Sequence, residues 1–277
     1  MNKKYKVLLA SSLIAVFIWA CQRVPLTNRK QFVGLVSGEQ MMSLSFQQYK
    51  GFLDTVKQVP ASKADAQMVA RVGERIKKAA ENYLIQQNLG SLLDGYQWEF
   101  RTVESKELNA WCMPGGKVVF YTGILPICQS EAGVAVVMGH EVAHAIAEHG
   151  RERMSRAMMA QGITQIGAVA AGVATGDQRV MEAAGQVLGI GTTLGGVLPN
   201  SRKQEAEADK IGLIFMSMAG YNPQEAVTFW QRMAKASENS QKPPKLLSTH
   251  PNDESRIANL TAQMDKAMKY YYAYGNK

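Results

Sequence analysis

The sequence predicts an α+β fold that is mainly helical, with one small β-sheet. Apolar residues recur at helical spacing in segments such as 68–79, whereas strand signals are confined to two short segments, the alternating residues 98–103 and the apolar residues 118–121. The chain has 277 residues, of which 46% are hydrophobic and 19% are charged. This is the composition of an ordinary globular protein, so we expect a buried core in one domain or two small ones.

The first twenty residues have the pattern of an export signal. Three lysines are followed by Val7–Ala20, 14 residues without charge, and then by Cys21. The residues before Cys21 resemble the lipobox of bacterial lipoproteins, although Trp19 is unusual there. We therefore expect residues 1–20 to be a lipoprotein signal peptide and Cys21 to be acylated, with residues 21–36 as an extended tether. The alternative is an uncleaved anchor helix, but a membrane span needs about 20 residues.

The charge and the cysteine content also bear on location. The net charge is +8, and three of the positive charges lie in the expected signal peptide. No cluster of Lys and Arg is interleaved with aromatic residues, so we expect no nucleic-acid partner. We expect a lipid-anchored protein of the bacterial cell envelope, on the outer membrane and facing the periplasm. Cys112 and Cys128 could form a disulfide there or stay buried as free thiols, and the sequence leaves both open.

Two scaffold helices are expected at the start of the mature domain, over 37–56 and 62–87. Each begins with a capping-box signal, at Ser37 and at Ser62, and Pro60 separates the two helices. In the second segment, apolar residues also recur at helical spacing from Met68 to Ala79. We expect these helices to support the residues that follow.

A small sheet is expected after the two helices. Residues 98–103 alternate with period two, and the apolar segment 118–121 follows a turn at Pro114-Gly115-Gly116. Residues 109–111 lie on the incoming arm of that turn. The pattern therefore predicts strands on both sides of the turn.

The strongest signal in the chain lies on the next helix, which we expect to begin after Ser130 and to end at Gly150. This helix is apolar on nearly all sides and contains His140-Glu141-Val142-Ala143-His144. Residues four apart on a helix differ by about 40° in direction, so both imidazoles point the same way and can hold one Zn²⁺. Glu141 lies about 100° from His140, where its carboxylate can act as the general base of a zinc protease.

A catalytic zinc needs a third protein ligand. His149 is the first candidate, but on one continuous helix it would point about 140° away from His144, so we interpret it as a surface or helix-end residue. Glu205 and Asp209 are four residues apart, so one carboxylate could bind the metal while the other accepts the free N–H of a ligating histidine. The spacing alone does not assign these two roles.

The middle of the chain admits two interpretations. Residues 157–176 and 183–201 are uncharged segments of 20 and 19 residues, which is long enough for membrane helices. They are rich in Gly and Ala and contain several Gln, which argues for weak insertion. We expect residues 157–200 to form a helical lid over the site, and a membrane-dipping hairpin is the alternative.

The C-terminal part is expected to complete the domain, which would span residues 37–277 without a further helical-repeat domain. A helix over 222–236 begins with Asn-Pro, a loop follows at 242–244, and a last helix begins at Asn252 or Asp253.

In this order, the motifs resemble those of the HtpX-like and CAAX-prenyl-endopeptidase-like zinc metallopeptidases, the gluzincins of peptidase family M48. The resemblance covers most of the mature chain, and several dispersed motifs are far more specific than one pentapeptide. The residues that carry it are Asn109-Ala110, Pro114-Gly115-Gly116, His140-Glu141 with His144, Ser201-Arg202 with Glu205, Ala208 and Asp209, and Ser248-Thr249-His250-Pro251 with Arg256.

The resemblance implies a zincin-like domain in which the edge strand of a small sheet flanks the active-site helix. It implies one Zn²⁺ per chain, with His140, His144 and Glu205 as ligands. Asp209 would contact a ligating histidine, and Glu141 would be the catalytic base.

The resemblance also assigns roles to three residues outside the metal motifs. His250 is expected to be catalytic, either by stabilising the oxyanion or by transiently capping the zinc, whereas its position before Pro251 alone would indicate a loop residue. Asn109 lies on the edge strand that would hold the substrate backbone. Arg256 is assigned to substrate binding with it.

We therefore expect a zinc metalloendopeptidase that cleaves unfolded, misfolded or damaged envelope proteins. Its expected partners are such substrates, the membrane through a lipid anchor, and the envelope assembly machinery. One alternative is an envelope assembly or chaperone-like factor with a latent, capped zinc site. A structural zinc protein is disfavoured, because structural sites are usually four-coordinate and rich in cysteine.

Overall fold

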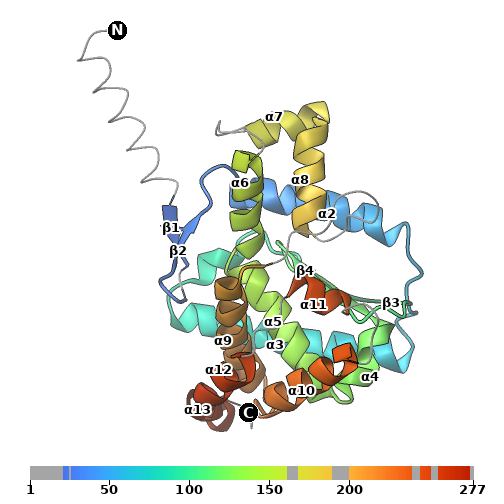
Figure 1. Ribbon diagram of the computed structural model, residues 1–277, viewed down its shortest axis with the longest axis vertical. Helices are drawn as coiled ribbons and strands as arrows, with labels where there is room; N and C mark the ends of the chain where they lie inside the picture. Colours follow the sequence, from blue (N-terminus) through green and yellow to red (C-terminus); the bar gives the residue numbers. More distant parts are fainter. Residues whose placement is uncertain are drawn as a thin grey trace, which may run out of the picture.

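The computed structural model has the mainly helical α+β fold that the sequence predicts, with a three-stranded sheet among the helices (Figure 1). The expected signal peptide, most of the expected loop at 242–244 and the start of the expected last helix lie outside the described residues. The structure describes residues 21–24, 26–160, 168–188, 200–238, 244–250 and 255–274.

The sheet has the order β3-β5-β4, which places β4 (Ala110–Met113) at an edge. The central strand β5 (Lys117–Tyr121) is buried throughout; it pairs parallel to β3 (Glu99–Val103) and antiparallel to β4. The turn between β4 and β5 requires glycine, because Gly115 and Gly116 have φ angles of 87° and 83°. Strands on both sides of this turn are thus confirmed.

Helix α5 (Glu131–Ile146) is the central helix and packs against β4 and against α9 (Arg202–Met218). The side chain of Ser130 caps α5 by accepting the N–H of Gly133. A Cβ atom on Gly139 would lie 2.8 Å from the carbonyl oxygen of Gly212, so glycine is needed where the two helices meet. This close approach brings the histidines of α5 to the carboxylates of α9.

The expected end of the metal helix at Gly150 is wrong. Helix α5 ends at Ile146, and α6 (His149–Ala160) begins after a turn in which Glu148 has a φ of 55°. This left-handed residue breaks the helix, because the next peptide units can no longer continue the α5 hydrogen-bond pattern. Gly150 is therefore part of α6.

The two scaffold helices are present. Helix α2 (Gly38–Leu53) has the expected capping box of Ser37 and Gln40. Helix α3 (Ala64–Gln86) begins after Lys63, which makes no side-chain cap, so the capping box expected at Ser62 is wrong. A short 3₁₀ helix, η1 (Gly90–Leu93), connects α3 to the sheet.

The segment expected to be an extended tether instead forms a hairpin that packs on the domain. Strand β1 (Cys21–Arg23) pairs antiparallel with β2 (Lys30–Phe32). Val24 and Val33 are fully buried, and Arg29 forms ion pairs with helices α6 and α9. These apolar and charged contacts hold the segment against the helices, so the tether expectation is corrected.

The described part of the expected lid contains the end of one helix and two further helices, and all three lie near α2 at one end of the molecule (Figure 1). They are α6, α7 (Ala168–Thr175) and α8 (Gln178–Leu188). Met154 and Val187 are buried in an apolar cluster that also contains Met41 of α2. This cluster is separate from the main core, in which α3, α5 and α9 meet.

None of the helices in the described part of the chain is, by itself, long and apolar enough to cross a membrane. Two consecutive segments, Thr122–Cys128 and Glu131–Ile146, are long and apolar enough only when they are taken together, and the chain bends by 118° between them. That pair consists of η2 (Thr122–Ile124), α4 (Leu125–Cys128) and the buried helix α5.

The C-terminal helices cover α5 and α9. The helix expected from 222 begins at Glu225, after a turn, and the expected last helix is divided in two at Gln263. Cys112 and Cys128 are free thiols, which answers the question that the sequence left open. The four C-terminal helices are α10 (Glu225–Glu238), α11 (Lys245–Thr249), α12 (Arg256–Ala262) and α13 (Met264–Tyr274).

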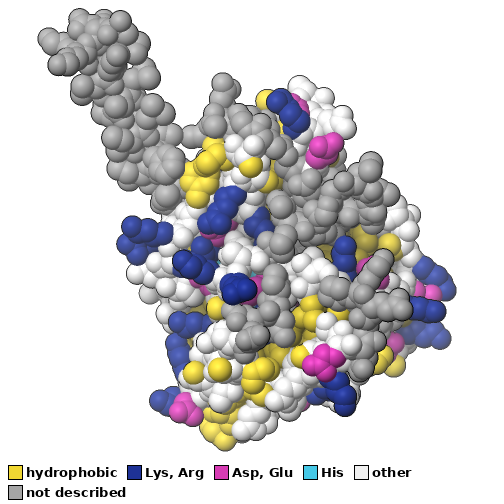
Figure 2. All heavy atoms as spheres, in the orientation of Figure 1, with side chains coloured by type: hydrophobic (Ala, Val, Ile, Leu, Met, Phe, Trp, Pro, Cys, Tyr) yellow, Lys and Arg dark blue, Asp and Glu magenta, His cyan; other side chains and the backbone are white. Residues whose placement is uncertain are grey.

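The face drawn in Figure 2 has mixed surface chemistry. Lys and Arg side chains lie there in separate groups, between acidic, apolar and uncharged ones, rather than in one continuous stripe.

Candidate metal centre

Helix α5 presents its two motif histidines on one buried face. His140 and His144 are 3% and 6% exposed, and their Nε2 atoms lie 3.1 Å apart. One helical turn separates the two residues, which is why their rings face the same point. Since the helix around them is buried, water has little access to this pair except from the cleft.

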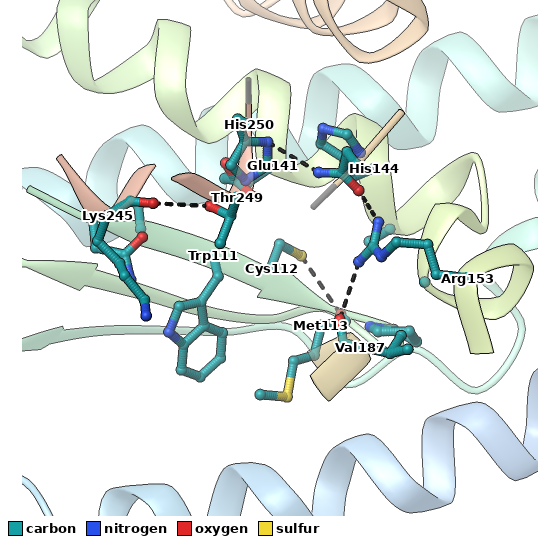
Figure 3. Close-up of a pocket in the computed structure, with 16 residues that line it drawn as sticks. Trp111, Cys112, Met113, Glu141, His144, Arg153, Val187, Lys245, Thr249 and His250 are labelled. Carbon is teal, nitrogen blue, oxygen red and sulfur yellow. Dashed lines mark hydrogen bonds and ion pairs between the residues drawn. The ribbon is translucent and has the colours of Figure 1, made fainter. Parts of the chain in front are cut away.

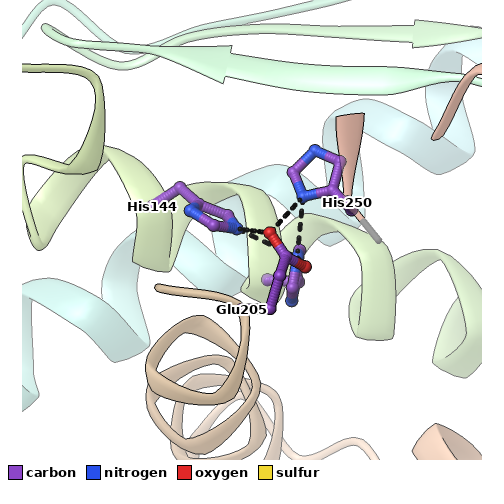
Figure 4. Close-up of side chains that lie close together, drawn as sticks. His144, Glu205 and His250 are labelled. Carbon is purple, nitrogen blue, oxygen red and sulfur yellow. Dashed lines mark hydrogen bonds and ion pairs between the residues drawn. The ribbon is translucent and has the colours of Figure 1, made fainter. Parts of the chain in front are cut away.

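Two further residues bring donor atoms to the same point (Figure 4). The carboxylate of Glu205, on α9, lies 3.3 Å from Nε2 of both histidines. Nδ1 of His250, just after α11, lies 3.1 Å from Glu205 and 3.1 Å from His140. One ligand atom from each of the four buried residues lies within 4.8 Å of the others.

These distances fit a tetrahedral metal ion. An ion that is bound tetrahedrally through bonds of about 2.0–2.1 Å separates its ligand atoms by about 3.3 Å. The pairs among His140, His144, Glu205 and His250 given above span 3.1–3.3 Å. Imidazole nitrogens and a carboxylate are also the donor types of zinc enzymes. The residues present therefore fit a metal ion.

The carboxylate of Glu205 is held in its ionised form. Burial alone would raise the pKa of Glu205, but the neighbouring imidazoles of His250 and His144 lower it well below its usual range. An ionised carboxylate is what a metal ligand requires.

Asp209 orients the first histidine. Its Oδ1 lies 2.9 Å from Nδ1 of His140, and the other ring nitrogen, Nε2, faces the converging donors. Burial would raise the pKa of Asp209, but Arg256 and His140 lower it. Asp209 thus lies in close polar contact with His140 and is not itself among the four converging donors.

The assignment of Arg256 to substrate binding is corrected by its surroundings. Its side chain is 2% exposed, and its guanidinium binds Asp209 at 2.7 Å and Glu205 at 2.6 Å. The guanidinium also lies 3.8 Å from the ring centroid of Trp230. The described polar contacts of Arg256 are therefore with the carboxylates beside the histidines, and its ring contact is with Trp230. Arg256 is not among the residues that line the cleft.

Of the two interpretations of His149, the surface residue is wrong, whereas the helix-end residue is confirmed, because His149 is the first residue of α6. His149 is fully buried, and its Nδ1 lies 2.7 Å from Nδ1 of His144. The expected angle of 140° assumed one continuous helix. Because α5 ends at Ile146 and α6 begins at His149, the new helix turns this side chain back toward His144.

Glu141 lies at the bottom of a cleft beside the donor set. It is 2% exposed, and its Oε1 has no hydrogen-bond partner among the described residues. The closest ring nitrogen is Nε2 of His250, at 3.4 Å. Burial raises the pKa of Glu141, which brings its basicity closer to neutral pH. A carboxylate oxygen that makes no hydrogen bond and lies beside a cleft can accept a proton.

The edge strand β4 forms one wall of this cleft, opposite Glu141, His144 and His250 (Figure 3). Asn109 and the whole of β4 line it, as the sequence predicts for the edge strand. Within the described sheet β4 pairs only with β5, so its other backbone edge is unpaired by any described strand. The cleft therefore has the form of a site for an extended peptide.

Sequence reasoning did not find two residues of the cleft, Arg153 and Asn200. Arg153 donates to the Asn200 side chain and to the carbonyl of Val187, and Nδ2 of Asn200 lies 3.1 Å from Nδ1 of His250. Burial lowers the pKa of Arg153 to about 10. Neither residue belongs to a spacing pattern; only the position of Asn200 next to Ser201-Arg202 could have drawn attention to it.

Comparison with known proteins agrees with this geometry. The sequence model of peptidase family M48 matches residues 67–264. The chain is 32% identical to the mitochondrial metalloendopeptidase OMA1 of Saccharomyces cerevisiae over 280 residues, which covers 98% of this chain and 76% of the yeast protein.

Two other relatives match over shorter segments. The chain is 38% identical over 184 residues to the mitochondrial metalloendopeptidase OMA1 of Arabidopsis thaliana, covering 65% of this chain and 35% of that protein. It is 29% identical over 164 residues to the beta-barrel assembly-enhancing protease of Escherichia coli K12, covering 58% of this chain and 33% of that protein. The family model covers the three-stranded sheet, the paired histidines and the carboxylates of α9. This chain belongs to peptidase family M48, the metallopeptidase family that its motifs resemble.

Proposed function

We propose that this protein is a zinc-dependent metalloendopeptidase that hydrolyses peptide bonds in unfolded, misfolded or damaged proteins of the bacterial cell envelope. One observation carries the proposal. Three imidazoles and a carboxylate converge beside a cleft that is lined by two of those imidazoles and by a separate buried carboxylate, Glu141, whose Oε1 makes no hydrogen bond to the described residues.

The residues divide the chemistry between them. His140, His144 and Glu205 would hold the zinc, which when bound lowers the pKa of water toward about 7 and polarises a carbonyl group. Glu141 takes the proton of the water that attacks the peptide carbonyl. It then passes that proton to the leaving amine as the C–N bond breaks, so the base is regenerated.

The shape of the cleft favours substrates without stable structure. A peptide can add to the free edge of β4 only in an extended conformation, with its backbone hydrogen-bonded to the strand beside Asn109. The carboxylate of Glu141 is almost fully buried, so the bond to be cut must enter deeply. A folded protein cannot present such a segment without local unfolding.

Attachment to the membrane is proposed from the N-terminus. The lipobox-like residues before Cys21 support an acylated cysteine and an outer-membrane location facing the periplasm. Relatives of this chain are named both mitochondrial and bacterial, so the bacterial envelope rests on that pattern alone. The name of the Escherichia coli relative suggests envelope assembly machinery as a further partner.

The direct test is cleavage of casein by the chain that begins at residue 22, with the bound metal quantified. We expect about one zinc per chain and fragments from casein, whereas folded lysozyme stays intact under the same conditions. Equal cleavage of the two proteins would contradict the preference for unfolded substrates. Metal-loaded protein that leaves both intact would contradict the proposed activity.

Removal of the metal is expected to destabilise the protein. A ligand present at about 1,000 times its dissociation constant stabilises the folded state by about 4 kcal/mol, which corresponds to a change in Tm on the order of 10 °C. Thermal unfolding before and after dialysis against a chelator measures this difference. Zn²⁺ should restore the original Tm and Mg²⁺ should not, because imidazole ligands favour zinc. A Tm that chelation leaves unchanged would contradict a structural contribution of the metal.

A latent form of the site is the second candidate, and the position of His250 favours it. Nδ1 of His250 is 3.1 Å from both His140 and Glu205, where it would take the fourth coordination position that an active site leaves open. We expect His250→Ala to raise the rate of casein cleavage, because the substitution frees that position. A lower rate with the metal retained would instead assign His250 to stabilisation of the oxyanion.

A further inference from the structure

A buried chain of polar side chains runs from the metal site away from the cleft. His149 contacts the ligand His144, Glu207 contacts His149, and Arg29 contacts Glu207. His149 is fully buried and Glu207 is 5% exposed. None of the residues beyond His144 lines the cleft. Their arrangement is therefore not explained by substrate binding.

The hydrogen atoms along this chain can be assigned from one end to the other. When Nε2 of His144 offers its lone pair to a metal, its Nδ1 carries the proton and donates to Nδ1 of His149, 2.7 Å away. His149 must then carry its own proton on Nε2, which lies 2.9 Å from the carboxylate of Glu207. Both rings are neutral, and each has one defined tautomer.

Arg29 fixes the carboxylate at the far end. Its Nε donates to Glu207 at 2.6 Å, and its terminal nitrogens bind Glu152 at 2.8 Å and 3.2 Å. Glu152 is fully buried and also accepts a hydrogen bond from Gln204. Arg29 immediately precedes β2, so the N-terminal hairpin is joined to two buried carboxylates on different helices.

We propose that His149 is a positioning residue for the metal ligand His144, and that Glu207 and Arg29 hold it in the required tautomer. The N-terminal hairpin thereby contributes to metal affinity although it lies outside the cleft. The inference rests on the metal site of the proposed function but not on its substrate. Residues that orient a metal-ligating histidine typically change metal affinity about 10–100-fold when they are replaced.

The test compares two substitutions of His149. His149→Phe keeps a planar ring but removes both nitrogens, whereas in His149→Gln the amide oxygen can accept from His144 and the amide N–H can donate to Glu207. We expect the zinc dissociation constant, measured by competition with a chelator, to rise about 10–100-fold for the Phe variant. The Gln variant should recover most of the affinity.

A second pair of variants tests the far end of the chain. Arg29→Met removes the partner of Glu207, whereas Arg156→Met removes only an exposed partner of Glu152, which it binds at 2.6 Å. We expect weaker zinc binding for Arg29→Met and unchanged binding for Arg156→Met. The absorption spectrum of bound Co²⁺ should also change in Arg29→Met, because the spectrum reports the geometry of the ligands.

The outcomes separate this inference from the proposed function. Wild-type affinity and an unchanged Co²⁺ spectrum in a folded His149→Phe protein would overturn the inference. If His149→Phe does not fold, equal affinities of Arg29→Met and Arg156→Met would overturn it. A wild-type chain that binds zinc but leaves casein intact would contradict only the proposed function, because the comparison of affinities is made without substrate.

Discussion

Replacement of Glu141 by Gln is expected to reduce kcat for casein cleavage by about 10²–10⁴-fold, the usual contribution of a general base. Glutamine has the same shape as glutamate but cannot accept the proton of the attacking water at neutral pH. Oε1 of Glu141 makes no hydrogen bond to the described residues, and its contact with Nε2 of His250 at 3.4 Å is one that the amide oxygen of Gln can keep. The loss should therefore be one of chemistry and not of folding.

Three measurements distinguish this role from a role in metal binding. The zinc content and the Tm of Glu141→Gln should equal those of the wild type, because Glu141 is not among the converging donors. Glu148→Gln is the matched control: Glu148 lies in the turn after α5, pairs with Arg151 at 3.0 Å and does not line the catalytic cleft. It should cleave casein at nearly the wild-type rate. Activity of Glu141→Gln above a tenth of the wild type would contradict the assignment.

The paired histidines could be predicted because their geometry is local. His140 and His144 are one turn apart on a helix whose apolar surroundings are evident in the sequence, so their common direction follows from helix geometry. The same holds for Glu205 and Asp209 on α9. Which of these two carboxylates binds the metal does not follow from spacing, because that depends on how α9 packs on α5.

The parts that sequence reasoning missed depend on breaks and on long-range packing. Nothing in the composition of the turn marks Glu148 as left-handed, yet this single φ angle ends α5 and reverses the expected direction of His149. Arg29 is 178 residues from Glu207 in sequence, and only the folded chain shows that they form an ion pair. Spacing rules apply within one element, so they describe neither the break nor this contact.

Arg256→Met is expected to have the largest effect on stability. Arg256 is 2% exposed and binds the carboxylates of both Asp209 and Glu205. Removing one partner of a buried ion pair typically costs about 3–5 kcal/mol, because the remaining charge is left without compensation. A Tm lower by about 6–20 °C follows for a chain of this size. Arg71→Met is the control, since Arg71 is 58% exposed and pairs with the half-buried Glu131, and the loss of such a pair costs about 1 kcal/mol or less.

The effect of Arg256→Met should also depend on pH. In the wild type, burial alone would raise the pKa of Asp209, but the lowering by Arg256 and His140 is larger. The pKa of Asp209 in the folded protein therefore lies below its value in the unfolded chain. This carboxylate therefore stabilises the fold above pH about 3.9, and the contribution is lost as the pH falls through the folded-state pKa. Without Arg256, we expect burial to raise the pKa of Asp209. Protonation of Asp209 at lower pH then removes the buried charge that destabilises the variant. Unfolding measured from pH 7 to pH 4 should show the difference in Tm between the two proteins narrowing, and a difference that is independent of pH would contradict the role of Arg256 as the counter-ion of Asp209.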